Sequence, residues 1–519
     1  MKNEKSNRRE FLKLSAAGLA SLGILKQLSP TEKAFAALPI ELNEMTVFEM
    51  QNAMKSGKFS ARMLVEAYLE QIKQIDPKIN SVIEINPDAL AIADQLDKER
   101  ARGKMRSLLH GIPILIKDNI DTADKMKTTA GSLALIDAPT PKTDAFVVKK
   151  LRKAGAIIIG KTNLSEWANF RSTKSISGWS GRGGQTNNPY ILTENPCGSS
   201  AGTGAAISAN LAAIGVGTET NGSIICPATR NGIVGIKPTL GLVSRSGIIP
   251  IAHTQDTAGP MTRSVTDAAI LLSILVGRDK TDAITEASKK GEKDYTKFLD
   301  REGLRGARIG VVRQYIGTNA KQKELFEANL EILKAGGATL VDVNFTEDYS
   351  KMGDDRLLVL LYEFKTDLNK YLSARGAKYK TLADLIKFNE ENKVKEMPLF
   401  GQEIFEQAQA KGDLTDKNYT DALARNKAAV REKGIDAVIA KDRLDALVAP
   451  AGGATWSIAA VAGYPYITVP AGFINNLPAG IGFFGRAFTE TALIKFAYAF
   501  EQQSKARKTP QFLAKTPTP

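Results

Sequence analysis

The chain has 519 residues, of which 43% are hydrophobic and 24% charged, a composition typical of soluble globular proteins. Its length allows about three domains or one large one. The two cysteines, Cys197 and Cys226, exclude a disulfide scaffold and a Cys₄ zinc site. The two histidines, His110 and His253, leave too few ligands for most histidine-based metal sites and little material for a Ser-His-Asp enzyme. We therefore expect neither a metal nor a cofactor.

The net charge is +14, from 70 basic and 56 acidic side chains. Outside the N-terminal segment the basic residues are interspersed and have few aromatic neighbours. A nucleic-acid groove needs clustered basic residues with stacking aromatics. The pattern indicates a solvated basic surface, and no nucleic-acid partner is expected.

Residues 1–36 have the pattern of an export signal. Arg8-Arg9 is followed by a short uncharged stretch from Leu14 to Leu25 and then by Ala34-Phe35-Ala36, a small-x-small cleavage pattern. Paired arginines favour the twin-arginine route, with its translocation machinery as a transient partner. We therefore predict a signal peptide over 1–36 and an exported, periplasmic or extracellular, mature chain over 37–519. The alternative is an ordinary amphipathic N-terminal helix.

No uncharged apolar run reaches the roughly 20 residues that a membrane span needs, so no span is expected in the mature protein. Helical periodicity and apolar runs predict alternating elements along the mature chain. Helices are predicted over 46–56, 60–76, 144–154, 321–335, 357–371, 419–433 and 491–505, and strands over 112–116, 156–159, 309–312, 466–469 and 480–484. Ser60 is the expected N-cap of the second helix. This alternation favours an α/β architecture around one large sheet.

Two Gly/Ser-rich segments, residues 195–204 and 217–227, are candidates for the chemistry. Successive backbone N–H groups in such segments can form a concave nest that stabilises an oxyanion, and nearby serines are candidate nucleophiles. Composition alone also fits ordinary loops. Residues 198–202 match the G-x-S-x-G elbow with Ser200 as nucleophile. That interpretation is disfavoured, because His253 is the only histidine downstream and Glu219 the only carboxylate between them.

The order of several segments resembles the amidase signature family over about residues 41–515. The matching segments are Gly111–Asn119, Gly160–Glu166, Cys197–Gly204, Gly217–Pro227, Gly232–Thr239, Asp256–Pro260 and Ala462–Pro470. Among its subgroups the chain is most similar to the peptide amidases, which remove ammonia from C-terminal carboxamides. The resemblance implies a single α/β domain with a large mixed sheet between helices. It also leads us to expect a helical region over 345–440 that shapes substrate specificity.

The resemblance implies a Ser–cis-Ser–Lys triad. Lys117 corresponds to the family's lysine, Ser199 to the bridging serine with a cis peptide bond, and Ser223 to the nucleophile. The implied oxyanion hole is formed by the backbone N–H groups of Thr220, Asn221, Gly222 and Ser223. The common family pattern has glycine at 197 and 221 and arginine at 225, where this chain has Cys197, Asn221 and Ile225. Main-chain donors survive a side-chain change, so the hole is retained.

The residue types suit this chemistry. Serine is a weak nucleophile until a base takes its proton. Lys117 ends an apolar run, and desolvation disfavours its charged form, so a neutral lysine can serve as the base. We predict hydrolysis of a carboxamide to a carboxylate and ammonia through an acyl-enzyme on Ser223. The substrates implied are C-terminal peptide amides or related small amides.

Three alternatives remain. A glutamine-hydrolysing amidotransferase subunit would act in the cytoplasm with partner subunits, against the export signal. A fatty-amide hydrolase would need an apolar membrane-docking surface. A non-enzymatic binding protein on the same scaffold would need none of the three triad residues.

Other residues receive simpler interpretations. Cys197 and Cys226 are read first as small packing residues, with a disulfide or a reactive thiol left open. Asp256 is read as structural. His110 and His253 are assigned no role.

Overall fold

The computed structural model describes residues 41–515, except for the side chains of residues 350 and 351. The predicted signal over 1–36 therefore lies outside the described residues. Within them, no helix combines the length and apolar character that crossing a membrane requires.

An 11-stranded mixed sheet runs through the described part of the chain, in the order β1-β3-β2-β6-β8-β7-β12-β13-β11-β9-β10. Its strands are β1 (Val82–Ile85), β2 (Pro113–Lys117), β3 (Ile157–Thr162), β6 (Ile214–Glu219), β7 (Val234–Lys237), β8 (Thr257–Thr262), β9 (Arg308–Val312), β10 (Thr339–Val343), β11 (Ala446–Pro450), β12 (Tyr466–Ile474) and β13 (Leu477–Phe484). Strand β2 is parallel to β3 and β6, whereas the pairs from β6 to β11 are antiparallel. A separate two-stranded sheet pairs β4 (Trp179–Ser180) with β5 (Gly184–Gln185).

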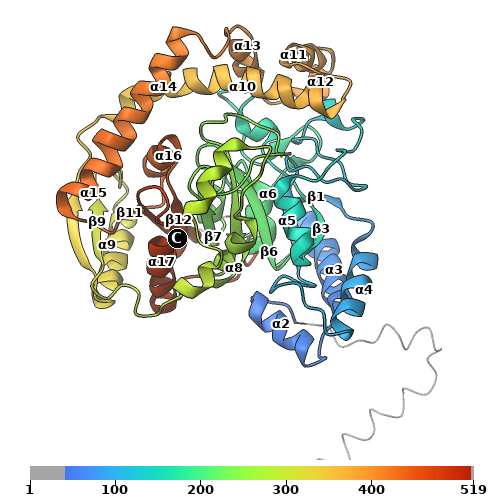
Figure 1. The fold of residues 1–519 in the computed structure, drawn as a ribbon, viewed down its shortest axis with the longest axis horizontal. Coiled ribbons are helices and arrows are strands. Elements are labelled where there is room, and N and C mark those ends of the chain that lie inside the picture. The colour runs from blue at the N-terminus through green and yellow to red at the C-terminus, as the bar shows by residue number, and fades with distance from the viewer. Residues whose placement is uncertain (1–40, 516–519) are drawn as a thin grey trace, which may run out of the picture. The chain divides into compact units, whose positions relative to one another are not determined.

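Helices pack on both faces of the large sheet (Figure 1). They are α2 (Val47–Lys55), α3 (Ala61–Ile79), α4 (Ala89–Ala101), α5 (Phe146–Ala154), α6 (Ala201–Ser208), α7 (Ile225–Arg230), α8 (Val265–Leu275), α9 (Ala320–Ala335), α10 (Gly353–Arg375), α11 (Leu382–Glu391), α12 (Lys393–Glu396), α13 (Glu403–Gln409), α14 (Lys417–Val430), α15 (Asp436–Asp442), α16 (Gly453–Ala462) and α17 (Glu490–Ser504). Short 3₁₀ or π turns are η3 (Leu133–Leu135), η4 (Glu166–Asn169), η5 (Ala283–Lys290), η6 (Tyr295–Phe298), η7 (Tyr349–Met352) and η8 (Arg431–Ile435). The predicted α/β class and large mixed sheet are confirmed.

The periodic segments fold as predicted. Ser60 caps α3 by accepting a hydrogen bond from the Met63 backbone N–H at 3.1 Å, and α3 buries its apolar face, including Leu64 and Tyr68. The apolar run before Lys117 is strand β2, which is buried along its whole length because β3 and β6 flank it and helices α3 and α6 pack on it. Helix α10 extends several residues beyond the predicted 357–371 at each end.

The segment 195–260, for which no elements were predicted, forms α6, α7 and strands β6, β7 and β8 in the middle of the sheet. Its small residues are needed for close packing. A Cβ atom on Gly202 would lie 2.4 Å from the carbonyl oxygens of Asn163 and Ser81. Because α6 and the three strands are buried on every side, they carry no polar face and hence no amphipathic period.

Helices α10 and α14 form an arch along the top and left of Figure 1, with α13 above α10 and with α11 and α12 near the right-hand end of α10. An apolar cluster attaches this region to two loops near the centre of the sheet. It joins Leu361, Phe364 and Leu368 of α10 to Phe170 and Ile251 of those loops, among other residues. The helical region therefore covers loops that lie next to the Gly/Ser-rich core.

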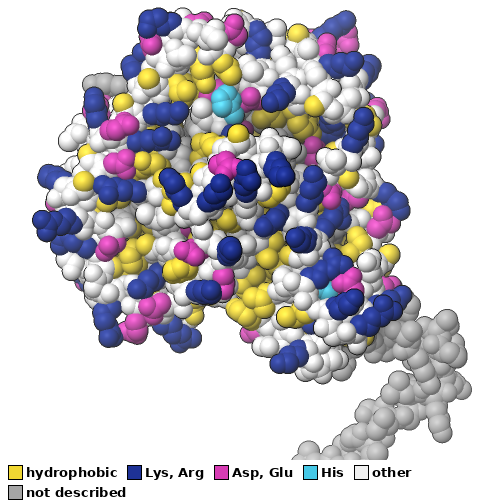
Figure 2. Space-filling model, in the orientation of Figure 1, with side chains coloured by type: hydrophobic (Ala, Val, Ile, Leu, Met, Phe, Trp, Pro, Cys, Tyr) yellow, Lys and Arg dark blue, Asp and Glu magenta, His cyan; other side chains and the backbone are white. Residues whose placement is uncertain are grey.

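Lys and Arg side chains are scattered over the face shown in Figure 2, with Asp and Glu side chains between them. Several of the basic side chains pair with carboxylates, as Arg425 does with Asp355 at 2.7 Å. This arrangement is that of a solvated charged surface.

Candidate active site

Lys117, the last residue of β2, lies inside the protein with no solvent-exposed surface. Its Nζ is 2.7 Å from Ser199 Oγ and 3.0 Å from Thr218 Oγ1, and 3.3 Å from the Thr218 carbonyl oxygen. Burial lowers the pKa of Lys117 from 10.5 to about 7, although the negative charges of Glu219 and Asp256 oppose the shift. Near neutral pH a substantial fraction of this lysine is therefore an uncharged amine, as a base requires.

Ser199 follows a cis peptide bond between Gly198 and Ser199, as the resemblance predicts. Its side chain is buried, and its carbonyl oxygen accepts a hydrogen bond from the Ser165 N–H at 3.1 Å. A Cβ atom at position 198 would lie 2.2 Å from Ser165 Oγ, so the close approach of these two segments requires glycine there. The loop carrying Ser165 thus packs against the cis segment and holds it by a hydrogen bond.

Ser223 lies in the loop between β6 and α7. Glu219 Oε2, buried at the end of β6, accepts hydrogen bonds from the backbone N–H groups of Ile224 and Ile225 at 2.7 and 3.0 Å, which fixes the turn. Gly222 has φ of +80°, a conformation that favours glycine. Ser223 retains 7% exposure, whereas Lys117 and Ser199 retain none.

The proposed oxyanion donors are unoccupied by protein acceptors. Within residues 41–515, the backbone N–H groups of Thr220, Asn221, Gly222 and Ser223 donate no hydrogen bond. Unpaired N–H groups are rare in folded proteins, and a set of them in one loop next to a serine forms a nest for a negatively charged oxygen. The loop is thus able to stabilise an oxyanion.

Two direct links join the segments of Ser199 and Ser223. The Ser200 N–H donates to the Ser223 carbonyl oxygen at 3.1 Å. The Ser199–Ser223 hydroxyl hydrogen bond that a proton relay needs is not formed in the described structure, where only the Lys117–Ser199 contact is made. Catalytic hydrogen bonds of this kind often tighten only when substrate binds.

The second link is a disulfide bond between Cys197 and Cys226. The first interpretation of these cysteines, as small packing residues, is therefore wrong. Cys197 precedes Ser199 by two residues and Cys226 follows Ser223 by three, so the bond fixes the two serine segments to each other. The spacing alone, 29 residues, could not distinguish packing from bonding.

Replacing both cysteines with serine is expected to lower stability and activity together. In the chain-entropy estimate, closing a loop of this size contributes about 3–4 kcal/mol. Denaturant unfolding should show a loss of this order, and kcat/KM should fall because the two segments are no longer fixed. A double variant with unchanged unfolding free energy and unchanged kcat/KM would contradict this role.

Ser200 has a different environment from the one that a nucleophile elbow requires. Its side chain is fully buried, and its hydroxyl donates to the Thr218 carbonyl oxygen at 3.1 Å. His253 bonds Asp367 and His110 bonds the Leu96 carbonyl, so in the described structure neither histidine contacts Ser200. This placement favours a supporting role for Ser200.

Asp256 connects the oxyanion loop to a neighbouring wall. Its Oδ1 accepts from Thr220 Oγ1 at 2.5 Å, and its Oδ2 accepts from the N–H groups of Ile251 and Ala252 at 2.8 and 2.9 Å. Burial raises the pKa of Asp256 to about 6, against these hydrogen bonds. Its contacts agree with the structural role predicted for it.

Asn221, which stands where the family commonly has glycine, bonds a neighbouring helix. Its side-chain amide donates to Ser457 Oγ of α16 at 3.0 Å, and Arg356 of α10 donates to the same oxygen at 2.6 Å. The substitution therefore ties the loop to two helices and leaves the backbone donors free. Ser457 and Arg356 carried no signal in the sequence, because their contact with Asn221 joins positions more than 100 residues away.

A cavity of about 290 Å³ opens beside these groups. Ser199, Thr218 and Thr220 are among the residues that line it. Ile249 and Tyr371 give it apolar surface, and its other lining residues include Arg245, His253, Asp256 and Asp367. This volume suits the acyl part of a small amide.

The family model of the amidases matches residues 63–458 of this chain. The solved structure of native peptide amidase from Stenotrophomonas maltophilia is 47% identical, with a TM-score of 0.89 over 91% of this chain and 100% of that one. A probable amidase of Arabidopsis thaliana is 41% identical over 97% of both chains. A glutamyl-tRNA(Gln) amidotransferase subunit from Thermoanaerobacter pseudethanolicus is 33% identical, covering 91% of this chain and 99% of that one.

Fold and matches together define the class of this protein, a hydrolase that acts on amide bonds. The chain belongs to the amidase family.

Proposed function

We propose that this amidase removes ammonia from the C-terminal carboxamide of peptides or related small amides, through an acyl-enzyme on Ser223. The observation that carries the proposal is the hydrogen bond between Lys117 and Ser199, which follows the cis peptide bond. Lys117 is buried, and its pKa is lowered to about 7. The free N–H groups of the neighbouring loop supply the oxyanion hole. The similarity to peptide amidase supports the substrate class.

In the proposed mechanism, neutral Lys117 takes the proton of Ser199 while Ser199 takes the proton of Ser223. Ser223 Oγ attacks the carboxamide carbon, and the backbone N–H groups of Thr220 to Ser223 stabilise the resulting oxyanion. Ser199 then protonates the departing nitrogen, which leaves as ammonia, and Lys117 returns its proton to Ser199 and becomes neutral again. Water attacks the ester, with the same residues taking and returning its proton, and a carboxylate is released.

Ammonia release by the purified protein tests this function. A peptide amide, a free amino-acid amide, an aliphatic amide and glutamine should be compared, with the Ser223→Ala variant as the blank. We expect the highest kcat/KM for the peptide amide. No ammonia from any of these amides would contradict the function and favour a binding protein.

The similarity to the amidotransferase motivates a second candidate, hydrolysis of free glutamine. Such an enzyme works with partner subunits in the cytoplasm. A preference for glutamine over the peptide amide would favour this candidate.

We also propose that the helical region over 345–440 shapes substrate specificity. Four residues of α10, Asp367, Lys370, Tyr371 and Ala374, line the cavity, and α10 packs on the loops beside the site. The acyl group of a substrate in the cavity would therefore contact α10.

Finally, we propose that residues 1–36 direct export through the twin-arginine route, so that the mature protein lies outside the cytoplasmic membrane. Changing Arg8→Lys and Arg9→Lys together should leave precursor inside the cell, because the pair is read by a receptor. Fractionation with an antibody gives the measurement, and mature protein should begin near Ala37. Undiminished secretion of the variant would contradict this route.

A further inference from the structure

One wall of the cavity is the loop from Arg245 to Asp256, here called the cavity wall. Arg245, His253 and Asp256 of this wall all line the cavity. Asp256 bonds Thr220 of the oxyanion loop at 2.5 Å, three residues before Ser223. The position of the cavity wall is therefore linked directly to the oxyanion loop.

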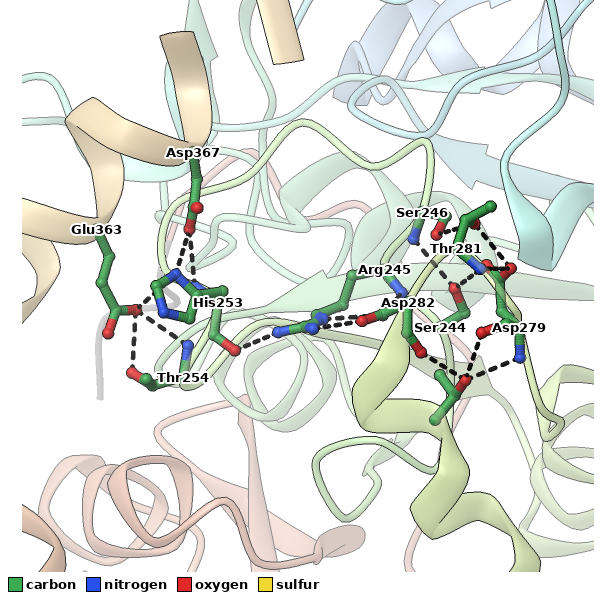
Figure 3. Close-up of polar contacts among 11 residues, drawn as sticks. Ser244, Arg245, Ser246, His253, Thr254, Asp279, Thr281, Asp282, Glu363 and Asp367 are labelled. Atoms are coloured by element: carbon green, nitrogen blue, oxygen red, sulfur yellow. Dashed lines mark hydrogen bonds and ion pairs between the residues drawn. The ribbon is translucent and has the colours of Figure 1, made fainter. Parts of the chain in front are cut away.

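Two carboxylates of α10 hold the cavity wall from the other side (Figure 3). Asp367 Oδ2 accepts from the backbone N–H of His253 at 3.1 Å and lies 2.7 Å from its Nδ1. Glu363 Oε2 accepts from the backbone N–H and the hydroxyl of Thr254, both at 3.0 Å. Positions 363 and 367 are four apart and so lie on one face of α10. Since α10 also lines the cavity, these contacts set the spacing between its two sides.

His253, Glu363 and Asp367 form a cluster, here called the His253 cluster, whose charge balance depends on whether the His253 ring is protonated. Glu363 has no exposed side-chain surface, and its Oε2 is 3.7 Å from His253 Nδ1. Arg245, whose charge also acts on His253, already pairs with Asp282 and donates to the His253 carbonyl oxygen. Within the described residues, a neutral imidazole would leave Glu363 and Asp367 without a cation at ion-pair distance, whereas an imidazolium supplies one.

The groups that act on this cluster come from several elements. Glu363 and Asp367 of α10 and Arg245, which is paired with Asp282, act on His253 itself. Asp256 interacts electrostatically with Asp367. Tyr419 and Lys427 of α14 interact electrostatically with Glu363. Tyr419 donates to Glu363 Oε1 at 2.9 Å. Burial lowers the pKa of His253, but the hydrogen bond to Asp367 and the charge of Glu363 outweigh it, so the pKa lies above 6.5.

A proton suits the cluster better than a metal ion does. Ligand atoms of His253, Glu363 and Asp367 lie within 4.8 Å of one another. Each of them nevertheless has a protein hydrogen-bond partner: Nδ1 and Asp367 bond each other, and Glu363 bonds Thr254 and Tyr419. Protonated His253 completes this network without an ion.

We propose that His253 is a positioning residue for the reaction: its imidazolium holds α10 against the cavity wall and keeps the acyl cavity in its substrate-binding form. This inference rests on the proposed function. A group whose pKa is raised by folding stabilises its contacts below the unfolded pKa and loses that contribution as pH rises through the folded pKa. KM should therefore increase on the alkaline side, while kcat follows the deprotonation of Lys117.

The ionisation of His253 can be measured directly, because the chain contains only two histidines. NMR of protein labelled with ¹³C-histidine, recorded with EDTA present, should give two imidazole signals, which His253→Asn assigns. We expect the pKa of His253 above 6.5 and a decrease in Asp367→Asn. Buried His110, whose pKa is lowered by burial, is the internal control. A pKa of His253 below 6.5 in the wild type would overturn the proposal.

Kinetics test the positioning role. His253→Asn retains a side-chain N–H donor toward Asp367 but cannot bind a proton. We expect its KM for the peptide amide to be raised about tenfold at pH 6 and to be independent of pH, with the Lys117 limb of kcat unchanged. Wild-type KM that stays constant from pH 6 to 9 would refute the proposal even if His253→Asn fails to fold. Active enzyme with this constant KM leaves the proposed function intact, whereas no ammonia from any amide refutes that function itself.

Discussion

Ser223→Ala is expected to lower kcat for amide hydrolysis by about 10⁴-fold or more, because no acyl-enzyme can form. The change removes one oxygen from a side chain that is 7% exposed and makes no hydrogen bond within the described residues, so the fold should be retained. Unfolding by denaturant should match the wild type within about 1 kcal/mol. Ammonia release measures the loss, and a variant that keeps most of its activity would remove Ser223 from the mechanism.

Covalent labelling identifies the nucleophile independently. A fluorophosphonate should label Ser223, and Ser200→Ala should leave that label in place. Ser200 is the matched control because its sequence also fits a nucleophile motif, whereas its hydroxyl is buried against Thr218. Label on Ser200 in the wild type would favour the nucleophile elbow.

Amphipathic periodicity was enough to predict the helices that have one solvent-exposed face, and short apolar runs were enough to predict buried strands. The helix that begins after Ser60 and the strand that ends at Lys117 are examples. The segment 195–260 could not be divided this way, since α6 and β6 are buried all round and rich in small residues. Strand order could not be read either: β7 pairs with β12, more than 200 residues later.

The site residues likewise fall into those that the sequence predicted and those that only the structure shows. Resemblance supplied Lys117, Ser199 and Ser223, and the cis bond before Ser199 agrees with it. It gave no signal for His253, which acquires its neighbours only when α10 brings Glu363 and Asp367 against it. Contacts between positions more than 100 residues apart follow from tertiary packing, which periodicity and motif spacing do not encode.

Lys117 should control the acid limb of activity. Its pKa of about 7 implies that kcat rises with pH through the neutral range as the amine loses its proton. Lys117→Met should lower kcat by about 10²–10⁴-fold, because the acceptor that activates Ser223 through Ser199 is removed. Lys117→Arg should be nearly as damaging, since arginine stays protonated.

The same lysine should also leave a signature in stability, which separates its ionisation from other effects on rate. Folding lowers its pKa from 10.5 to about 7, so between these pH values the unfolded chain binds a proton that the folded chain lacks. Stability should therefore rise with pH across this interval. A shift of this size opposes folding at pH 7 by on the order of 4 kcal/mol. Lys117→Met abolishes that contribution and also loses the hydrogen bonds to Ser199 and Thr218. The free energy of unfolding of this inactive variant should therefore depend less steeply on pH.

Lys237 provides the matched control for this final prediction. It too is fully buried, and burial lowers its pKa to about 8, but its Nζ bonds the Pro238 carbonyl oxygen at 3.0 Å. Lys237→Met should flatten the pH dependence of stability in the same way, yet leave the acid limb of kcat where it is. Urea unfolding and ammonia release, each measured from pH 6 to 10 for wild type and both variants, make the comparison. If the acid limb of kcat moves in Lys237→Met, or persists at wild-type rates in Lys117→Met, then Lys117 is not the base.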